Sequence, residues 1–184
     1  SLPGADVAGR GVPPGQACCI ITGGNLSPGM NPAREDSAVL QTKRLVLRPY
    51  TDADQARMIE LMTDARIRAT FMIPDFGTPA EAAAMFEKLK RFSHSQAHYE
   101  RGIYTDGELI GFVNDVEIDG DAIEIGYVIH PGHQNRGYAT EALAAVIADL
   151  FHRGFREVRA AAFAGNAASR RVMEKCGLRL TGEA

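Results

Sequence analysis

A glycine-bearing loop joins an apolar run to an amphipathic helix in the second half of the chain. The run Ile125–Ile129 is followed by the turn His130–His133, and Gln134–Ala139 then opens the helix. The N–H groups of a first helical turn have no intrahelical partners and lie at the positive end of the helix dipole, so they can bind anionic oxygens. Gly137 would let a phosphate approach the backbone closely because it has no side chain. The spacing therefore predicts a pyrophosphate-binding loop.

The glycine count separates this loop from two common nucleotide-binding motifs. The chain has no GxxxxGK[ST] sequence, and Gln134–Ala139 holds one glycine where the dinucleotide fingerprint needs three at fixed spacing. This disfavours P-loop NTPases and Rossmann oxidoreductases.

Gln134, Gly137 and Ala139 match motif A of the GNAT superfamily of N-acetyltransferases, Gln/Arg-x-x-Gly-x-Gly/Ala. The segments around it, Glu124–Tyr127, Ala139–Ala142 and Asn166–Gly177, resemble the RimJ/RimL-like branch, which acetylates ribosomal-protein N-termini. The resemblance implies acetyl-CoA as co-substrate. It also implies a mixed α/β (α+β) fold: a central, mostly antiparallel sheet with a splayed parallel strand pair around the cofactor cleft and helices on both faces.

The resemblance also implies which residues bind the cofactor. Main-chain amides near Val128 and Ile129 would hold the pantetheine arm and the thioester carbonyl. Asn166 would cap the last helix and could also contact the pantetheine. The full expected set is Val128, Ile129, Gln134, Asn135, Arg136, Gly137, Tyr138, Ala139, Thr140 and Asn166. Within it, the guanidinium of Arg136 suits bidentate phosphate binding.

The last helix carries the clearest catalytic candidate. Ser169 shares a helical face with Val172, Met173 and Cys176, so its hydroxyl is expected to point toward the cleft. Many superfamily members have a tyrosine at the position of Met173, and Met173 cannot donate a proton. The resemblance implies that Ser169 protonates or hydrogen-bonds the leaving thiolate; the alternative is a hydrogen bond from Ser169 to its own helix. Cys176 reads as core, so no covalent acetyl-enzyme is expected.

A general base must accept a proton from the attacking amine, and Glu124 is the first candidate. Its alternative role is a cross-strand ion pair with an arginine. Asp115 and Glu117 are weaker candidates for the base. His130 and His133 flank the loop turn without a further ligand at helical spacing, so no metal site is expected.

Alternating and helical patterns predict the elements that position these residues. Leu45 and Leu47 alternate with polar residues as in a half-buried strand. Thr51 and Thr78 can cap two helices, and Asp106-Gly107 suits a two-residue hairpin turn. The predicted strands are 43–49, 99–105, 108–118, 122–130 and 157–163, and the last two should be parallel neighbours because a helix connects them.

Composition indicates one domain. The chain has 184 residues, is 45% hydrophobic and carries a formal net charge of −3, which gives no indication of a nucleic-acid partner. No apolar run approaches a membrane span and no signal peptide is evident, so no membrane partner is expected. The three cysteines do not form a disulfide framework, which favours the cytoplasm. Residues 1–40 are expected to be a disordered or non-native extension, and residues 41–184 an acetyltransferase domain whose C-terminus stops short of a further strand pair.

The predicted function is an N-acetyltransferase that moves the acetyl group of acetyl-CoA to a primary amine by direct transfer in a ternary complex. The acceptor is a protein N-terminus or a small-molecule amine, and the protein is a monomer or homodimer. The alternative is a non-catalytic acyl-CoA-binding or sensor protein of the same fold.

Overall fold

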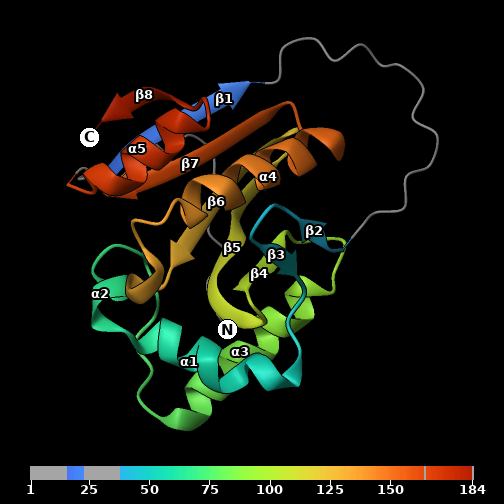
Figure 1. The fold of residues 1–184 in the computed structure, drawn as a ribbon, viewed down its shortest axis with the longest axis vertical. Coiled ribbons are helices and arrows are strands. Elements are labelled where there is room, and N and C mark those ends of the chain that lie inside the picture. Colours follow the sequence, from blue (N-terminus) through green and yellow to red (C-terminus); the bar gives the residue numbers. More distant parts are fainter. Residues whose placement is uncertain (1–15, 23–37, 164, 184) are drawn as a thin grey trace.

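The computed structural model describes residues 16–22, 38–163 and 165–183. They form an eight-stranded sheet in the order β2-β3-β4-β5-β6-β7-β1-β8 (Figure 1). The strands are β1 (Gln16–Thr22), β2 (Leu40–Gln41), β3 (Val46–Arg48), β4 (Glu100–Thr105), β5 (Glu108–Asp119), β6 (Ala122–Ile129), β7 (Glu157–Phe163) and β8 (Arg179–Glu183). The helices are α1 (Gln55–Thr63), α2 (Ala65–Arg68), α3 (Pro79–Ser93), α4 (Tyr138–His152) and α5 (Ala167–Lys175), with 3-10 turns η1 (Asp52–Asp54) and η2 (Pro131–His133).

The sheet is antiparallel except between β6 and β7. These two strands pair in parallel from Ala122 opposite Glu157 to Ile125 opposite Ala160, and the pairing ends there. Beyond Ile125 the two strands therefore separate. The predicted mostly antiparallel sheet with a splayed parallel pair is confirmed.

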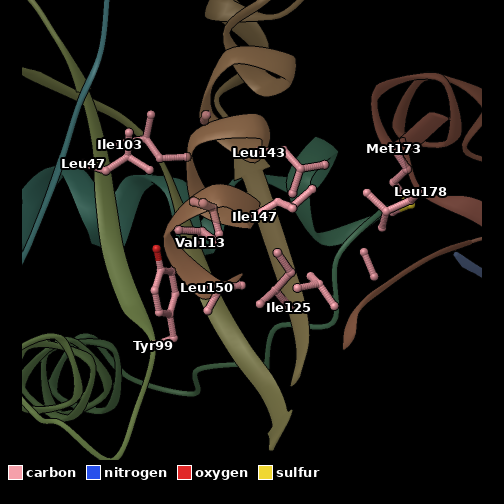
Figure 2. Packing of buried hydrophobic residues seen from close by; sticks show 14 of the residues in the cluster. Leu47, Tyr99, Ile103, Val113, Ile125, Leu143, Ile147, Leu150, Met173 and Leu178 are labelled. Carbon is pink, nitrogen blue, oxygen red and sulfur yellow. The ribbon is translucent and has the colours of Figure 1, made fainter. Parts of the chain in front are cut away.

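Apolar side chains cover both faces of the sheet. On one face, the stripe of α4 that includes Leu143, Ile147 and Leu150 packs against strand residues such as Ile125 (Figure 2). On the other face, α1 and α3 pack against Phe112 and further residues of β3 to β6. Figure 1 shows α4 and α5 on one side of the sheet and α1 to α3 on the other, which confirms helices on both faces. None of the helices in the described ranges combines the length and apolarity needed to cross a bilayer.

Strand β1 differs from the expectation for the N-terminal region. Gln16–Thr22 lie within the range expected to be disordered or non-native, yet they pair with β7 on one side and β8 on the other. Strand β2 also begins at Leu40, one residue inside that range. The apolar run from Ala17 to Ile21 is typical of a strand, but the glycine and proline residues on both sides of it favour an unstructured segment. Residues 1–15 and 23–37 lie outside the described residues.

A buried carboxyl group lies under the helices on the α1–α3 side. Glu100 is 2% exposed, and the Tyr50 hydroxyl donates a 2.5 Å hydrogen bond to it. Burial raises the pKa of Glu100 to about 8; the Tyr50 hydrogen bond and Arg101 oppose this rise, and the charge of Asp115 adds to it. Glu100 is therefore protonated in the folded protein at pH 7 and has its ordinary acidity when unfolded.

This shift predicts a pH-dependent stability. For a raised pKa the contribution to stability is complete below the unfolded pKa of 4.5 and is lost as pH rises toward 8. We expect Glu100 to remove about 3 kcal/mol from the free energy of unfolding between pH 5 and pH 8. Glu100→Gln should reduce the change in the free energy of unfolding with pH, while its amide oxygen still accepts from Tyr50. Glu100→Ala should lower the free energy of unfolding at all three pH values. Urea unfolding of the three proteins at pH 5, 6.5 and 8 measures this, and an unchanged slope in Glu100→Gln would contradict it.

Candidate active site

A cavity of about 560 Å³ opens where β6 and β7 separate. Its wall comes from α2 and the turn after it, the end of β6, the loop before α4, the first turn of α4, β7 and α5. The lining residues are Arg66, Ile67, Thr70, Phe71, Tyr127, Val128, Ile129, Pro131, His133, Gln134, Asn135, Gly137, Tyr138, Ala139, Thr140, Ala161, Ala162, Asn166, Ala168, Ser169, Arg171, Val172 and Lys175. All predicted cofactor residues except Arg136 belong to this lining, and so does Ser169.

Gly137 forms the N-terminal end of α4. It adopts φ = +80°, a left-handed conformation that a glycine takes without steric cost, and the first intrahelical hydrogen bond runs from Glu141 N to Gly137 O at 3.0 Å. The N–H groups of Tyr138, Ala139 and Thr140 precede that bond and have no intrahelical acceptor. Because these residues line the cavity, their amides and the helix dipole suit an anion there.

Arg44 holds this loop from outside. Its Nη1 donates to Arg136 O at 2.8 Å and its Nε pairs with Glu141 Oε2 at 2.7 Å. Glu141 Oε1 also accepts hydrogen bonds from Arg44 N and from the Thr42 hydroxyl, at 2.8 and 2.6 Å. The guanidinium also lies 4.6 Å from the centre of the Tyr138 ring. Sequence reasoning missed Arg44, since nothing in a strand-forming segment indicates a contact 92 residues along the chain.

We expect Arg44→Ala to weaken acetyl-CoA binding about tenfold, or roughly 1.4 kcal/mol, because the loop would lose the side chain that fixes the Arg136 carbonyl and Glu141. Titration calorimetry with acetyl-CoA measures this. Arg156→Ala is the matched control, since Arg156 pairs with Asp121 at the surface and does not line the cavity. Equal affinity in both variants would show that the clamp does not shape the loop.

The backbone of β6 presents alternate amides to the cavity. His130 N donates to Ile110 O of β5 at 2.7 Å, so the amide of Val128, two residues earlier, also faces β5. The amides of Tyr127 and Ile129 then face the separation between β6 and β7. The Ile129 amide therefore has the direction expected of a group that binds the pantetheine arm. The Val128 amide faces β5 instead, and the second amide that faces the separation is that of Tyr127.

The loop residues differ in what they contribute. Gln134 Nε2 donates to Ile129 O at 2.9 Å, so this side chain braces the loop against β6. Asn135 adopts φ = +61°, a conformation that asparagine tolerates better than most residues. Arg136 contributes its carbonyl to Arg44, and its side chain is not part of the cavity wall. Arg171 and Lys175 of α5 supply cationic side chains to the wall instead.

Ser169 forms a hydrogen bond across the cavity wall. Its Oγ lies 2.8 Å from the Tyr127 hydroxyl, which can also donate to Ser169 O at 3.2 Å. Asn166 caps α5 by accepting from Ser169 N at 3.1 Å. Tyr127 belongs to the segment Glu124–Tyr127 that resembles the family, but the sequence does not predict it as a site residue, because its partner Ser169 lies 42 positions later. Met173, which is 1% exposed, belongs to the core.

Cys176 lies beside the helix end of the site. Its thiol donates to Thr140 O at 3.4 Å, and burial raises its pKa. A raised pKa makes the nucleophilic thiolate scarcer at neutral pH, which agrees with the prediction that Cys176 carries no acetyl group.

Glu124 lies just outside the cavity wall. It shares a face of β6 with Gly126 and stands opposite Arg159 in the last part of the parallel pair. Burial raises its pKa, the charge of Glu117 on the neighbouring strand raises it further, and Arg159 lowers it. This environment fits both predicted roles: a carboxyl with a raised pKa suits a general base, and Arg159 is the arginine that a cross-strand pair would need.

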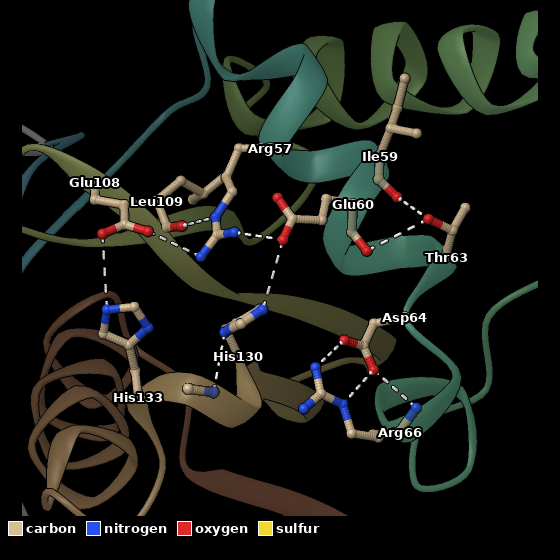
Figure 3. Close-up of polar contacts among 11 residues, drawn as sticks. Arg57, Ile59, Glu60, Thr63, Asp64, Arg66, Glu108, Leu109, His130 and His133 are labelled. Atoms are coloured by element: carbon tan, nitrogen blue, oxygen red, sulfur yellow. Dashed lines mark hydrogen bonds and ion pairs between the residues drawn. The ribbon is translucent and has the colours of Figure 1, made fainter.

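A charged network fixes the turn before the loop (Figure 3). Arg57 of α1 pairs with Glu60 at 2.7 Å and with Glu108 at 2.9 Å. His130 Nε2 lies 3.7 Å from Glu60, and His133 Nε2 lies 3.7 Å from Glu108. The network tethers η2 to α1 and the start of β5. In the described ranges there is no group of three or more metal-ligating side chains.

Comparison with known proteins finds acetyltransferases. The family model described as "Acetyltransferase (GNAT) domain" matches residues 44–179. Two curated proteins of Bacillus subtilis (strain 168), the uncharacterized N-acetyltransferases YoaA and YnaD, are 26% and 29% identical to this chain over 149 residues; each alignment covers 78% of this chain and 84% of the relative.

Solved structures show the same fold. A GNAT-family acetyltransferase from Bacillus anthracis superposes with a TM-score of 0.67 at 24% identity, covering 78% of this chain and 85% of that one. RimL, a ribosomal L7/L12 alpha-N-protein acetyltransferase in complex with coenzyme A, superposes with a TM-score of 0.71 at 19% identity over the same shares. The family match spans most of the described domain, so this chain belongs to the GNAT acetyltransferase family and is an acyltransferase enzyme.

Proposed function

We propose that the protein transfers the acetyl group of acetyl-CoA to a primary amine in a ternary complex. The observation that carries this proposal is the continuous cavity wall from the first turn of α4 to the Tyr127–Ser169 hydrogen bond. One end of this wall suits the phosphates of the cofactor and the other holds hydroxyl groups able to supply a proton. The acceptor is a protein N-terminus or a small-molecule amine, as in GNAT acetyltransferases generally.

The residues of the wall have distinct proposed roles. The amides of Tyr138, Ala139 and Thr140 bind the pyrophosphate, with Arg171 and Lys175 supplying positive charge nearby. The amides of Tyr127 and Ile129 hydrogen-bond the pantetheine arm and the thioester carbonyl oxygen, where negative charge develops. Asn166 caps α5 and lines the cavity, which supports its proposed contact with the pantetheine.

Proton transfer completes the step. The amine nitrogen loses a proton to Glu124 through water and attacks the thioester carbon. The carbon–sulfur bond then breaks, and the leaving sulfur takes a proton from the Tyr127–Ser169 hydroxyl pair. This pair supplies the donor that Met173 cannot. The products are the N-acetylated amine and coenzyme A.

Two measurements test the proposal. A ligand at 100 times its dissociation constant stabilises a protein by about 2.7 kcal/mol, so acetyl-CoA should raise the unfolding temperature while ATP and NAD should not. Release of free thiol from acetyl-CoA should then depend on added amine. A thermal shift without amine-dependent thiol release would support the non-catalytic acyl-CoA-binding alternative, and the absence of a shift would overturn both.

A further inference from the structure

An apolar surface adjoins the cavity at the end away from α4. Phe71 lines the cavity and also a neighbouring hollow formed with Arg68, Met72, Ile73 and Pro74. The two hollows share Phe71, so they are neighbours. Met72 is 74% exposed and is the most exposed large hydrophobic side chain of the described residues. We call Phe71–Pro74 the apolar lip.

The lip is fixed against the sheet. The Phe71 ring packs edge-on against Phe112 with centroids 5.5 Å apart. A side chain at Gly126 would come within 2.8 Å of the Phe71 ring, so this glycine lets the ring lie on β6. Phe71 N also donates to Ile67 O at 2.9 Å. The apolar surface is therefore held in place before any acceptor arrives.

An unsatisfied acceptor atom lies beside that contact. Asn114 Nδ2 donates to Asp115 O at 3.2 Å, which assigns the orientation of the amide. Asn114 Oδ1 is buried and has no hydrogen-bond partner, and it lies 3.2 Å from the position that a Gly126 side chain would occupy.

The charges around the lip are already paired. Arg68 binds Asp75, and Arg66 binds Asp64 through Nη2 and Oδ2 at 2.6 Å. No carboxylate occurs among the residues that line the cavity or the hollow in the described ranges. A second cationic group on an acceptor would thus find no free anion at the lip.

We propose that the acceptor is a primary amine carried on an apolar body, such as the α-amine of a leucine-like residue, with no second cationic group. This inference rests on the proposed acetyl transfer. The apolar body lies on Phe71–Pro74, and the amine enters the cavity past Phe71, which lines both hollows. Such an amine belongs either to a free amino acid or to a protein N-terminus.

Five acceptors separate these possibilities. We expect kcat/KM for leucine amide to exceed that for glycine amide and for spermidine by at least about tenfold, since even small apolar groups give such factors in an apolar site. Free leucine and a leucine-initiated tripeptide then identify the source: preference for the former indicates an amino acid, and preference for the latter a chain terminus. Glycine amide or spermidine acetylated as well as leucine amide would overturn the inference.

Met72→Glu tests the lip itself. The exposed position should tolerate the change, and we expect kcat/KM to fall about tenfold for leucine amide and to rise for spermidine. Leu180→Glu is the control, because Leu180 is 42% exposed and lies outside both hollows. Unchanged selectivity in Met72→Glu would overturn the inference.

The acetyl-CoA thermal shift is measured on every variant, so the two proposals can fail separately. A shift with thiol release for spermidine but not for leucine amide would refute the apolar acceptor and leave acetyl transfer standing. A shift without thiol release for any amine would refute acetyl transfer and the acceptor class together.

Discussion

Gly137→Ala is expected to weaken acetyl-CoA binding by about 30-fold or more, roughly 2 kcal/mol. The φ of +80° costs a residue with a Cβ about 1 kcal/mol or more of stability, whether or not acetyl-CoA is bound. The loss of affinity comes instead from the position of that Cβ, which would lie 3.2 Å from Arg44 Nη2. Moving Arg44 would release the Arg136 carbonyl and Glu141, while the added methyl group would also obstruct an anion at the helix end. Titration calorimetry measures the affinity.

Gly107→Ala provides the control for backbone strain. Gly107 has the same φ of +80°, in the β4–β5 hairpin, but a Cβ there would meet nothing within 4 Å. Both variants should lose similar stability to urea, and only Gly137→Ala should lose affinity. If the two variants bind acetyl-CoA equally well, the close approach to Gly137 plays no part in binding.

Local patterns were sufficient for the parts of the site that lie close together in sequence. The loop from Gln134 to Thr140 and the cap at Asn166 depend on turns and on unsatisfied amides, which a short stretch of residues determines. The strand–helix–strand order likewise predicted that β6 and β7 are parallel neighbours, and the family resemblance predicted that they separate. All these elements are present in the fold.

Contacts between distant segments could not be read in the same way. Arg44 reaches the loop from the bend between β2 and β3, and Tyr127 of β6 meets Ser169 of α5 although 42 positions separate them in sequence. The Val128 amide faces β5 because of the β5–β6 register, which depends on a bulge between Asp115 and Glu117. The apolar run in β1 needed knowledge of its neighbours β7 and β8 before it could be placed.

The Tyr127–Ser169 pair is expected to have the largest effect on turnover. General acid catalysis typically contributes 10²- to 10⁴-fold, so Tyr127→Phe should lower kcat by about 100-fold with acetyl-CoA affinity nearly unchanged. The phenol and the Ser169 hydroxyl are 2.8 Å apart and either can be the donor in their hydrogen bond. Tyr99→Phe is the control: it removes a buried tyrosine hydroxyl that binds Asp149 and does not line the cavity.

Comparison with Ser169→Ala and the double variant shows how the proton is supplied. If the two hydroxyls act as one relay, each single variant should lose most of the activity and the double variant should be only slightly worse, because residues that act as a unit are not additive. If Tyr127 alone is the acid and Ser169 orients it, Ser169→Ala should cost about 10-fold and Tyr127→Phe far more. Single-turnover rates at saturating acetyl-CoA isolate the chemical step. If both single variants turn over at the rate of the unmodified protein, the hydroxyl pair only ties α5 to β6, and the leaving thiolate must be protonated by water.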